Sequence, residues 1–121
     1  MSVKTKALGN WGEQKAKEYL TQKSIHIIGQ NIYTKFGEID LVGLKEDSII
    51  FFEIKTRKSK RFGYPEVSVN TKKQQRLIEA AQAYLGENEI TVQNWRIDVI
   101  SISIDRNGKA EIQWFENAVS C

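Results

Sequence analysis

Two runs of this sequence place charged side chains inside stretches that otherwise resemble buried β-strand. The apolar run 49–52 leads directly into Glu53 and Lys55, and the run 37–44 carries Asp40 among isoleucine, leucine and valine. A strand this apolar is usually central and covered on both faces. Ionised side chains are rare in such strands unless they are paired or bind a cation. The pattern therefore predicts two core strands that end at a polar site.

The alternation of side chains along a strand decides which residues of the second run lie together. Because successive side chains point to opposite faces, the odd positions share one side. These are Ile49, Phe51, Glu53 and Lys55. The acid and the lysine then lie roughly 7 Å apart, which leaves room for a divalent cation at the acid and a water or phosphate oxygen at the ammonium. For this pair alone, a simple ion pair at the end of a strand is the commoner arrangement.

The short segment between the two strands changes that balance. It is centred on residues 45–47, a length that predicts a β-hairpin. Asp40 and Glu53 can then converge at neighbouring strand ends, close to Lys55. Two acids and a lysine in this position favour a functional site over an isolated ion pair.

Composition excludes several classes of protein. From 121 residues we expect one domain, residues 1–121, with one core. The single cysteine, Cys121, has no partner for an internal disulfide or a thiol zinc site, and one histidine, His26, disfavours His-rich metal sites and a Ser-His-Asp triad. No apolar run approaches the roughly 20 residues of a transmembrane helix, and the N-terminus lacks the apolar segment of a signal peptide. We expect a cytoplasmic protein with no membrane partner.

Hydrophobic periodicity predicts an α/β fold. The chain order is helix, three strands, helix and two strands, which gives a central mixed five-stranded sheet flanked by helices. Gly86 is expected to end the second helix. The predicted helices cover about 7–23 and 70–85, and the predicted strands cover about 25–33, 38–44, 48–56, 95–104 and 110–115.

Glu13 is the acid whose position the first helix leaves open. It borders the apolar face of that helix, which carries Trp11, Ala16 and Leu20. An acid in this place either faces solvent without a role or reaches over the sheet toward Asp40. Helical spacing alone does not decide between the two.

Basic residues are concentrated in one part of a chain whose net charge is only +3. One group follows the Glu-x-Lys motif, and a second lies in or near the first turn of the second helix, where the helix dipole makes cations mildly unfavourable. Free amide groups and lysines at a helix start can bind phosphate, and a basic patch suggests a polyanionic partner. The alternative is a solvated surface. The candidate nucleic-acid-binding residues are Arg57, Lys58, Lys60, Arg61, Lys72, Lys73 and Arg76.

The chemistry of the acids and the lysine points to phosphodiester hydrolysis. Carboxylate oxygens suit a hard cation such as Mg²⁺ or Mn²⁺. Such an ion activates water and neutralises charge on a phosphoryl oxygen. A neighbouring lysine can hold the water, act as a base or stabilise the transition state. The predicted catalytic residues are Asp40, Glu53 and Lys55.

At these residues the chain resembles the PD-(D/E)xK nuclease superfamily and, over nearly its full length, the YraN-like family of small bacterial proteins, which are related to archaeal Holliday junction resolvases. The motifs that match in order are Gly12-Glu13, Gly37-Glu38-Ile39-Asp40-Leu41, Phe52-Glu53-Ile54-Lys55-Thr56-Arg57, Lys73, Arg96-Ile97-Asp98-Val99 and the closing segment 114–118. The resemblance implies a restriction-endonuclease-like fold, a Mg²⁺-dependent site and a nucleic-acid substrate. It also implies that Glu13, Asp40, Glu53 and the Ile54 carbonyl bind the metal and that Lys55 is the catalytic lysine. Ile39 replaces the leading proline of the superfamily motif.

Three functional hypotheses follow. The first is a Mg²⁺- or Mn²⁺-dependent endonuclease that acts on DNA, including branched or damaged structures. The second is a non-catalytic nucleic-acid-binding module, and the third is a structural or protein-interaction domain whose acids are ion-paired. A homodimer is expected if the substrate is a branched junction, because two strands must be cut at one place.

Overall fold

The computed structural model describes residues 3–58, 71–91 and 94–119, so the predicted phosphate contacts Lys60 and Arg61 lie outside the described residues. Seven elements follow in the predicted order. They are α1 (Val3–Gln22), β1 (His26–Thr34), β2 (Gly37–Lys45), β3 (Ser48–Lys58), α2 (Thr71–Glu87), β4 (Asn94–Ile104) and β5 (Ala110–Val119).

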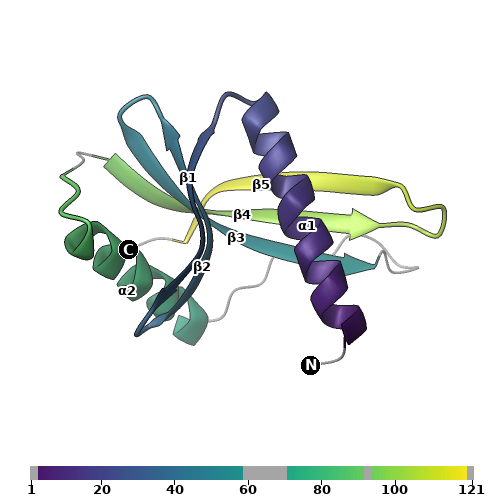
Figure 1. Cartoon of the computed structure of the whole chain (residues 1–121), viewed down its shortest axis with the longest axis horizontal. Coiled ribbons are helices and arrows are strands. Elements are labelled where there is room, and N and C mark those ends of the chain that lie inside the picture. Colours follow the sequence, from purple (N-terminus) through teal and green to yellow (C-terminus); the bar gives the residue numbers. More distant parts are fainter. Residues whose placement is uncertain (1–2, 59–70, 92–93, 120–121) are drawn as a thin grey trace.

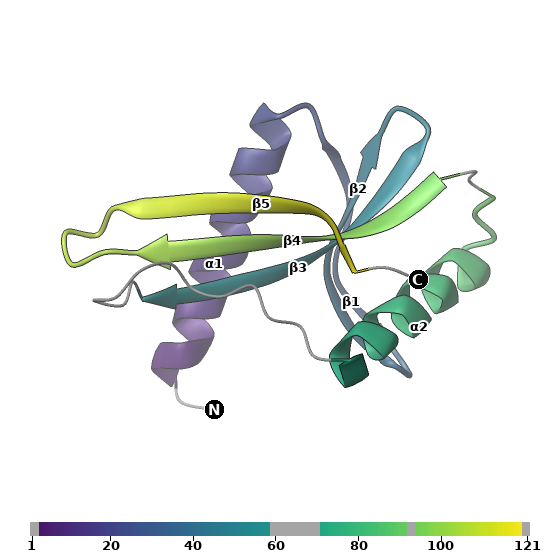
Figure 2. The ribbon, with the colours of Figure 1, turned by 180° about the vertical axis from the view of Figure 1, so that it is seen from behind.

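The five strands form one sheet in the order β1-β2-β3-β4-β5. The pairs β1–β2, β2–β3 and β4–β5 are antiparallel, and β3–β4 is parallel. The predicted β2–β3 hairpin is confirmed, with Leu41 opposite Phe52 and Lys45 opposite Ser48. The two helices lie on opposite sides of the sheet (Figure 1; Figure 2 gives the view from behind). The α/β fold with a central mixed sheet flanked by helices is therefore confirmed.

Strand β3 divides its side chains between two apolar clusters. Ile49 and Phe51 pack with buried residues of α2, whereas Ile50 and Phe52 pack with buried residues of α1. Glu53, two positions after Phe51, contacts Lys73 of α2. The strand is thus covered on both faces as its composition predicts, and its acid points toward α2.

The end of α2 differs from the prediction. Gly86 lies inside the helix, which continues to Glu87, and Glu89 takes the left-handed conformation with φ of 52°. The amide of Ile90 then donates to the carbonyl of Leu85 at 2.9 Å, which closes the helix end. Glycine is the usual residue for the left-handed conformation. Here the hydrogen-bond pattern places this conformation at Glu89, three positions after Gly86.

Helix α1 approaches β3 closely at Gly12. A Cβ atom at this position would lie 2.7 and 2.8 Å from Cβ and Cγ2 of Thr56, closer than side-chain carbons pack. Glycine therefore sets the spacing between the helix and the sheet. The next residue, Glu13, consequently lies over the sheet rather than out in solvent.

Asp98 fastens the edge strand β5 to β4. Its fully buried carboxylate accepts hydrogen bonds from Arg96 Nε at 3.0 Å, Trp114 Nε1 at 2.9 Å and the Asn117 amide at 2.7 Å. Three donors compensate a buried charge that would otherwise be costly. The bonds lie where the β4–β5 register shifts, so this motif has a structural role.

The helices of the described residues are too short or too polar to cross a bilayer.

We predict that Gly12→Ala destabilises the protein by about 1–3 kcal/mol, because α1 must move away from Thr56. Gly9→Ala is the matched control, since a Cβ atom at Gly9 meets nothing within 4 Å. It should stabilise the same helix by about 0.5–1 kcal/mol. Urea unfolding measures both free energies. Equal effects of the two substitutions would contradict the close-packing account.

Candidate functional site

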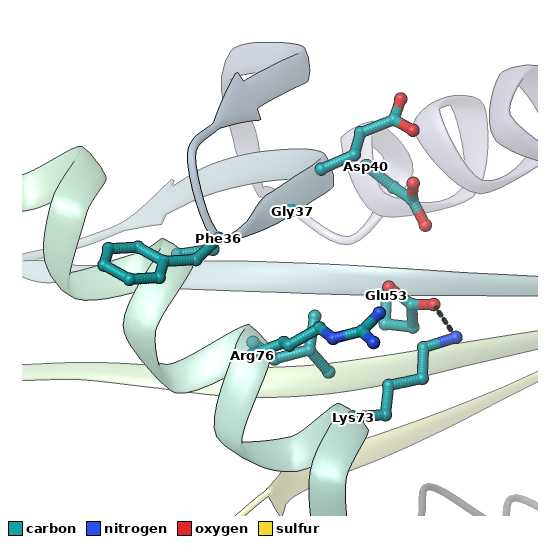
Figure 3. A pocket seen from close by; sticks show the side chains of 9 residues that line it. Phe36, Gly37, Asp40, Glu53, Lys73 and Arg76 are labelled. Atoms are coloured by element: carbon teal, nitrogen blue, oxygen red, sulfur yellow. Dashed lines mark ion pairs between the residues drawn. The ribbon is translucent and has the colours of Figure 1, made fainter.

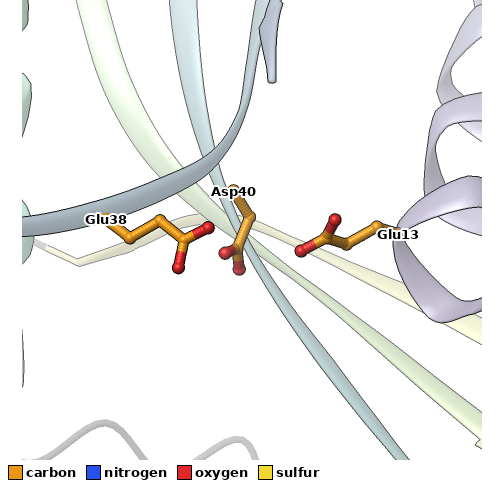
Figure 4. A group of neighbouring side chains, drawn as sticks. All are labelled: Glu13, Glu38 and Asp40. Carbon is orange, nitrogen blue, oxygen red and sulfur yellow. The ribbon is translucent and has the colours of Figure 1, made fainter. Parts of the chain in front are cut away.

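Three carboxylates converge near the start of β2, at the end of the β2–β3 hairpin that lies away from its turn. Glu13 comes from α1, and Glu38 and Asp40 come from β2. One oxygen of each lies within 4.8 Å of the others (Figure 4). Opposite oxygen ligands of one Mg²⁺ lie roughly 4 Å apart, so the three oxygens have a spacing that a single hard cation accommodates.

Glu38 was not among the ligands predicted from the sequence. Prediction placed Glu53 with Glu13 and Asp40, whereas the tight group contains Glu38 instead. The signal was present, because Glu38 lies two positions before Asp40 on the same strand and shares its face. The nuclease motif that the chain resembles points to Glu53, and not to Glu38, as a metal ligand.

Asn31 of β1 holds two of these acids together. With its amide nitrogen turned toward the carboxylates, the orientation that satisfies both groups, Asn31 donates to Glu38 Oε1 at 3.0 Å and to Glu13 Oε1 at 3.1 Å. Its backbone is left-handed, with φ of 50°, which asparagine tolerates better than most residues. Sequence reasoning missed Asn31, because its place beside the acids depends on the β1–β2 register.

Glu53 lies on the α2 side of the same region. It is 9% exposed, and its Oε1 is 2.8 Å from Lys73 Nζ (Figure 3). Asp40 and Glu53 line one pocket of about 210 Å³, together with Lys73 and Arg76. The remaining lining residues are Phe36, Gly37, Glu38, Leu77 and Ala80. The acids and the start of α2 therefore face a common space.

Burial and neighbouring acids act strongly on Asp40. Removal of its carboxyl from water, followed by the charge of Glu53, raises its pKa from 3.8 to about 7. The backbone amide of Ile54 donates to its Oδ2 at 2.8 Å and opposes this shift. Glu13 is affected similarly: burial raises its pKa, against the hydrogen bond from Asn31. Excess negative charge in a partly dry site is the property that a divalent cation relieves.

Lys55 lies on the same face as Glu53, as the alternation of β3 predicts. Its pKa is lowered by burial and then by the charge of Lys73, with Glu53 acting in the opposite direction and Arg57 adding to the decrease. These influences place Lys55 among the charged groups of the site. A lysine whose ammonium form is disfavoured is better able to exchange a proton with water.

The predicted basic residues do not all gather at this pocket. Lys73 and Arg76, one helical turn apart on α2, line it directly. Arg57 acts on Lys55. Lys58 lines a different hollow, with Arg106 in the β4–β5 turn. Lys72 lies on α2 and is exposed to solvent. That it contacts phosphate stays a prediction.

We predict that the metal-free protein loses stability as the pH rises from about 4 to about 7. In this window the folded protein retains a proton on Asp40 that the unfolded chain has released. The loss is up to about 1.4 kcal/mol per pH unit and ends above the folded-state pKa. Asp40→Asn cannot ionise and keeps an oxygen for the Ile54 amide, so its unfolding free energy should fall less. Parallel pH curves for the two proteins would contradict this account.

The comparisons with known proteins agree on one family. The sequence profile of the Uncharacterised protein family UPF0102 matches residues 12–102. A UPF0102 protein of Syntrophomonas wolfei is 42% identical over 111 residues, which cover 92% of this chain and 96% of the relative. UPF0102 proteins of Marinobacter nauticus and Syntrophotalea carbinolica are 39% and 37% identical over 115 and 118 residues. These cover 95% and 98% of this chain and 94% and 95% of the relatives. The chain therefore belongs to the uncharacterised protein family UPF0102, the YraN family that its motifs resemble.

Proposed function

We propose that this protein is a Mg²⁺- or Mn²⁺-dependent endonuclease that hydrolyses phosphodiester bonds of DNA. The observation that carries the proposal is the convergence of Glu13, Glu38 and Asp40 within 4.8 Å, next to a pocket that Lys73 and Arg76 also line. Acids suit a hard cation, and neighbouring bases suit the phosphates of the substrate.

The donor set fits such a cation. Burial raises the pKa of Asp40, and the negative charges of Glu53 and, to a smaller extent, of Glu13 and Glu38 add to this increase. All three acids offer oxygen, the ligand atom that Mg²⁺ and Mn²⁺ prefer. When bound, the ion would neutralise charge on the phosphoryl group and make a bound water more acidic.

The residues of the chain would then divide the remaining work. Asn31 orients Glu13 and Glu38, and the Ile54 amide fixes Asp40. Lys55, on the strand next to Asp40, would hold the attacking water or stabilise charge developing on phosphoryl oxygens. These are the parts that a phosphodiester hydrolase needs, and four elements of the fold hold them: α1, β1, β2 and β3.

The basic side chains of α2 would position the substrate. Lys73 and Arg76 point into the pocket from one face of the helix (Figure 3). Contacts of this kind hold the sugar–phosphate backbone and carry no base information. The proposal therefore expects cleavage governed by DNA structure more than by sequence.

One observation favours a second candidate, a non-catalytic nucleic-acid-binding module. Glu53 is ion-paired with Lys73, so this acid has a cationic partner without any metal. A module that only binds DNA has no use, however, for three further carboxylates in front of its phosphate partner, because uncompensated acids repel phosphate. We therefore place the endonuclease first.

We predict that the protein cleaves at least one of linear, flapped or four-way DNA in the presence of Mn²⁺. Lys55→Ala should lower the cleavage rate at least about 100-fold, because charge stabilisation is lost in the transition state. DNA affinity should change by less than about threefold, since Lys55 is one charge among several. The control is Lys45→Ala, which removes an exposed lysine from the distant turn of the hairpin.

Two outcomes would contradict that prediction. A comparable loss of affinity and cleavage would make Lys55 a DNA-binding residue. DNA binding by the wild type without cleavage of any of the substrates would favour the non-catalytic module.

We also predict that Lys72 and Lys73 contact phosphates. Each phosphate contact on duplex DNA contributes about −0.9 to the slope of log affinity against log salt. Removing both lysines should therefore make the slope shallower by up to about 2 in the presence of Ca²⁺, with similar losses on unrelated sequences. An unchanged slope, measured by fluorescence anisotropy, would leave these lysines on a solvated surface.

A further inference from the structure

Lys73 reaches from an exposed helix face to a buried acid. Its side chain is 45% exposed, whereas that of Glu53 is 11% exposed, and the ion pair between them measures 2.8 Å. A buried carboxylate without a partner is strongly destabilising. The ammonium therefore neutralises Glu53 in the protein without a metal.

The same ammonium lies beside the other charged groups of the pocket. Asp40 and Glu53 line the pocket with Lys73, and the charge of Lys73 acts on Lys55. A divalent cation at the acids would therefore carry positive charge close to two lysines. Lys73 lies on α2 rather than on the sheet, and its side chain is about half exposed, so it can turn away from the acids without moving the sheet.

We propose that Lys73 is an exchangeable counter-ion. Lys73 neutralises Glu53 while the carboxylates hold no divalent cation. Once a cation is present, Lys73 leaves Glu53 and binds a phosphate of the substrate. This inference rests on the proposed function, because it assumes that the acids bind a cation and that the partner carries phosphate.

The exchange links the two binding events. A cation that frees Lys73 strengthens phosphate binding, and phosphate that attracts Lys73 strengthens cation binding by the same factor. Glu53 becomes available as a ligand only after the exchange. Glu53 then has two states: it pairs with Lys73 when no cation is present, as observed, and it binds the metal after the exchange, as predicted from the sequence.

Arg76 provides a matched control. It lines the same pocket as Glu53 and Lys73, one helical turn further along α2, and Figure 3 shows its side chain among those that line the pocket. Within the described parts of the chain, the ion pair to Glu53 is made by Lys73 and none is made by Arg76. Removing either residue removes one positive charge from the pocket. Only the loss of Lys73 also removes the ammonium that competes with a divalent cation for Glu53.

The first measurement is calorimetric titration of Mn²⁺ into the wild type, Lys73→Gln and Arg76→Gln. We expect Lys73→Gln to bind Mn²⁺ roughly tenfold more tightly than the wild type, because the acid no longer exchanges partners. Arg76→Gln should differ from the wild type by less than about threefold, since it changes only the surrounding charge. Thermal unfolding checks that each variant is folded, and Mn²⁺ should raise the melting temperature most in Lys73→Gln.

The second measurement is the salt dependence of DNA binding with and without Ca²⁺. Added Ca²⁺ should steepen the slope by about 0.9 more in the wild type and in Arg76→Gln than in Lys73→Gln, because one more phosphate contact forms. This measurement needs no cleavage.

The outcomes separate the inference from the proposed function. Equal Mn²⁺ affinities for the two variants, or equal Ca²⁺ effects on their salt slopes, would overturn the exchange and leave the metal site intact. Failure of the wild type to bind Mn²⁺ would overturn both. If the exchange is observed but no DNA substrate is cleaved, the inference is supported and the proposed nuclease activity is rejected.

Discussion

The burial of β3 on both faces is the constraint on which the rest of the structure depends. Its alternate apolar residues pack under α1 and α2, which fixes the sheet between the two helices. At the end of the apolar run, the side chain of Glu53 is still buried and has little contact with water. A charge in that position requires a partner, and Lys73 supplies one. The candidate site thus begins where the core strand stops being apolar, and Gly12 lets α1 approach closely enough to add Glu13.

Much of the fold could be predicted because its periodicities are strong. The odd and even positions of β3 sort to opposite faces as the alternation requires, and the short turn after β2 forces an antiparallel hairpin. Helix ends and strand ends were less predictable. Gly86 resembled a helix stop, yet α2 ends through a left-handed Glu89, because the choice depends on hydrogen bonds and packing around Ile90. Strand β5 continues to Val119, and in this added segment the Asn117 amide donates to Asp98 of β4, a contact between strands that local spacing does not specify.

The candidate site was predictable only in part, for a physical reason. Strand alternation places Glu53 and Lys55 on one face from sequence alone. The position of Glu13 depended on how closely α1 approaches the sheet, which no helical pattern specifies. Asn31 and the Glu53–Lys73 pair depend on strand register and on the placement of α2, and neither follows from local spacing. Strand alternation also places Glu38 on the face of Asp40, but the motif indicates Glu53 as the third acid, so the motif alone does not predict the group that the structure brings together.

The central claim is that Glu13, Glu38 and Asp40 bind a divalent cation. Anomalous diffraction from crystals grown with Mn²⁺ tests it most directly, because the signal locates the ion without assumptions about its ligands. The account predicts a peak within roughly 2.0–2.3 Å of carboxylate oxygens of Asp40 and at least one of the two glutamates. It also predicts that Lys73 Nζ has moved away from Glu53. A peak at other residues, or no peak while the acids stay as they are, would contradict the account.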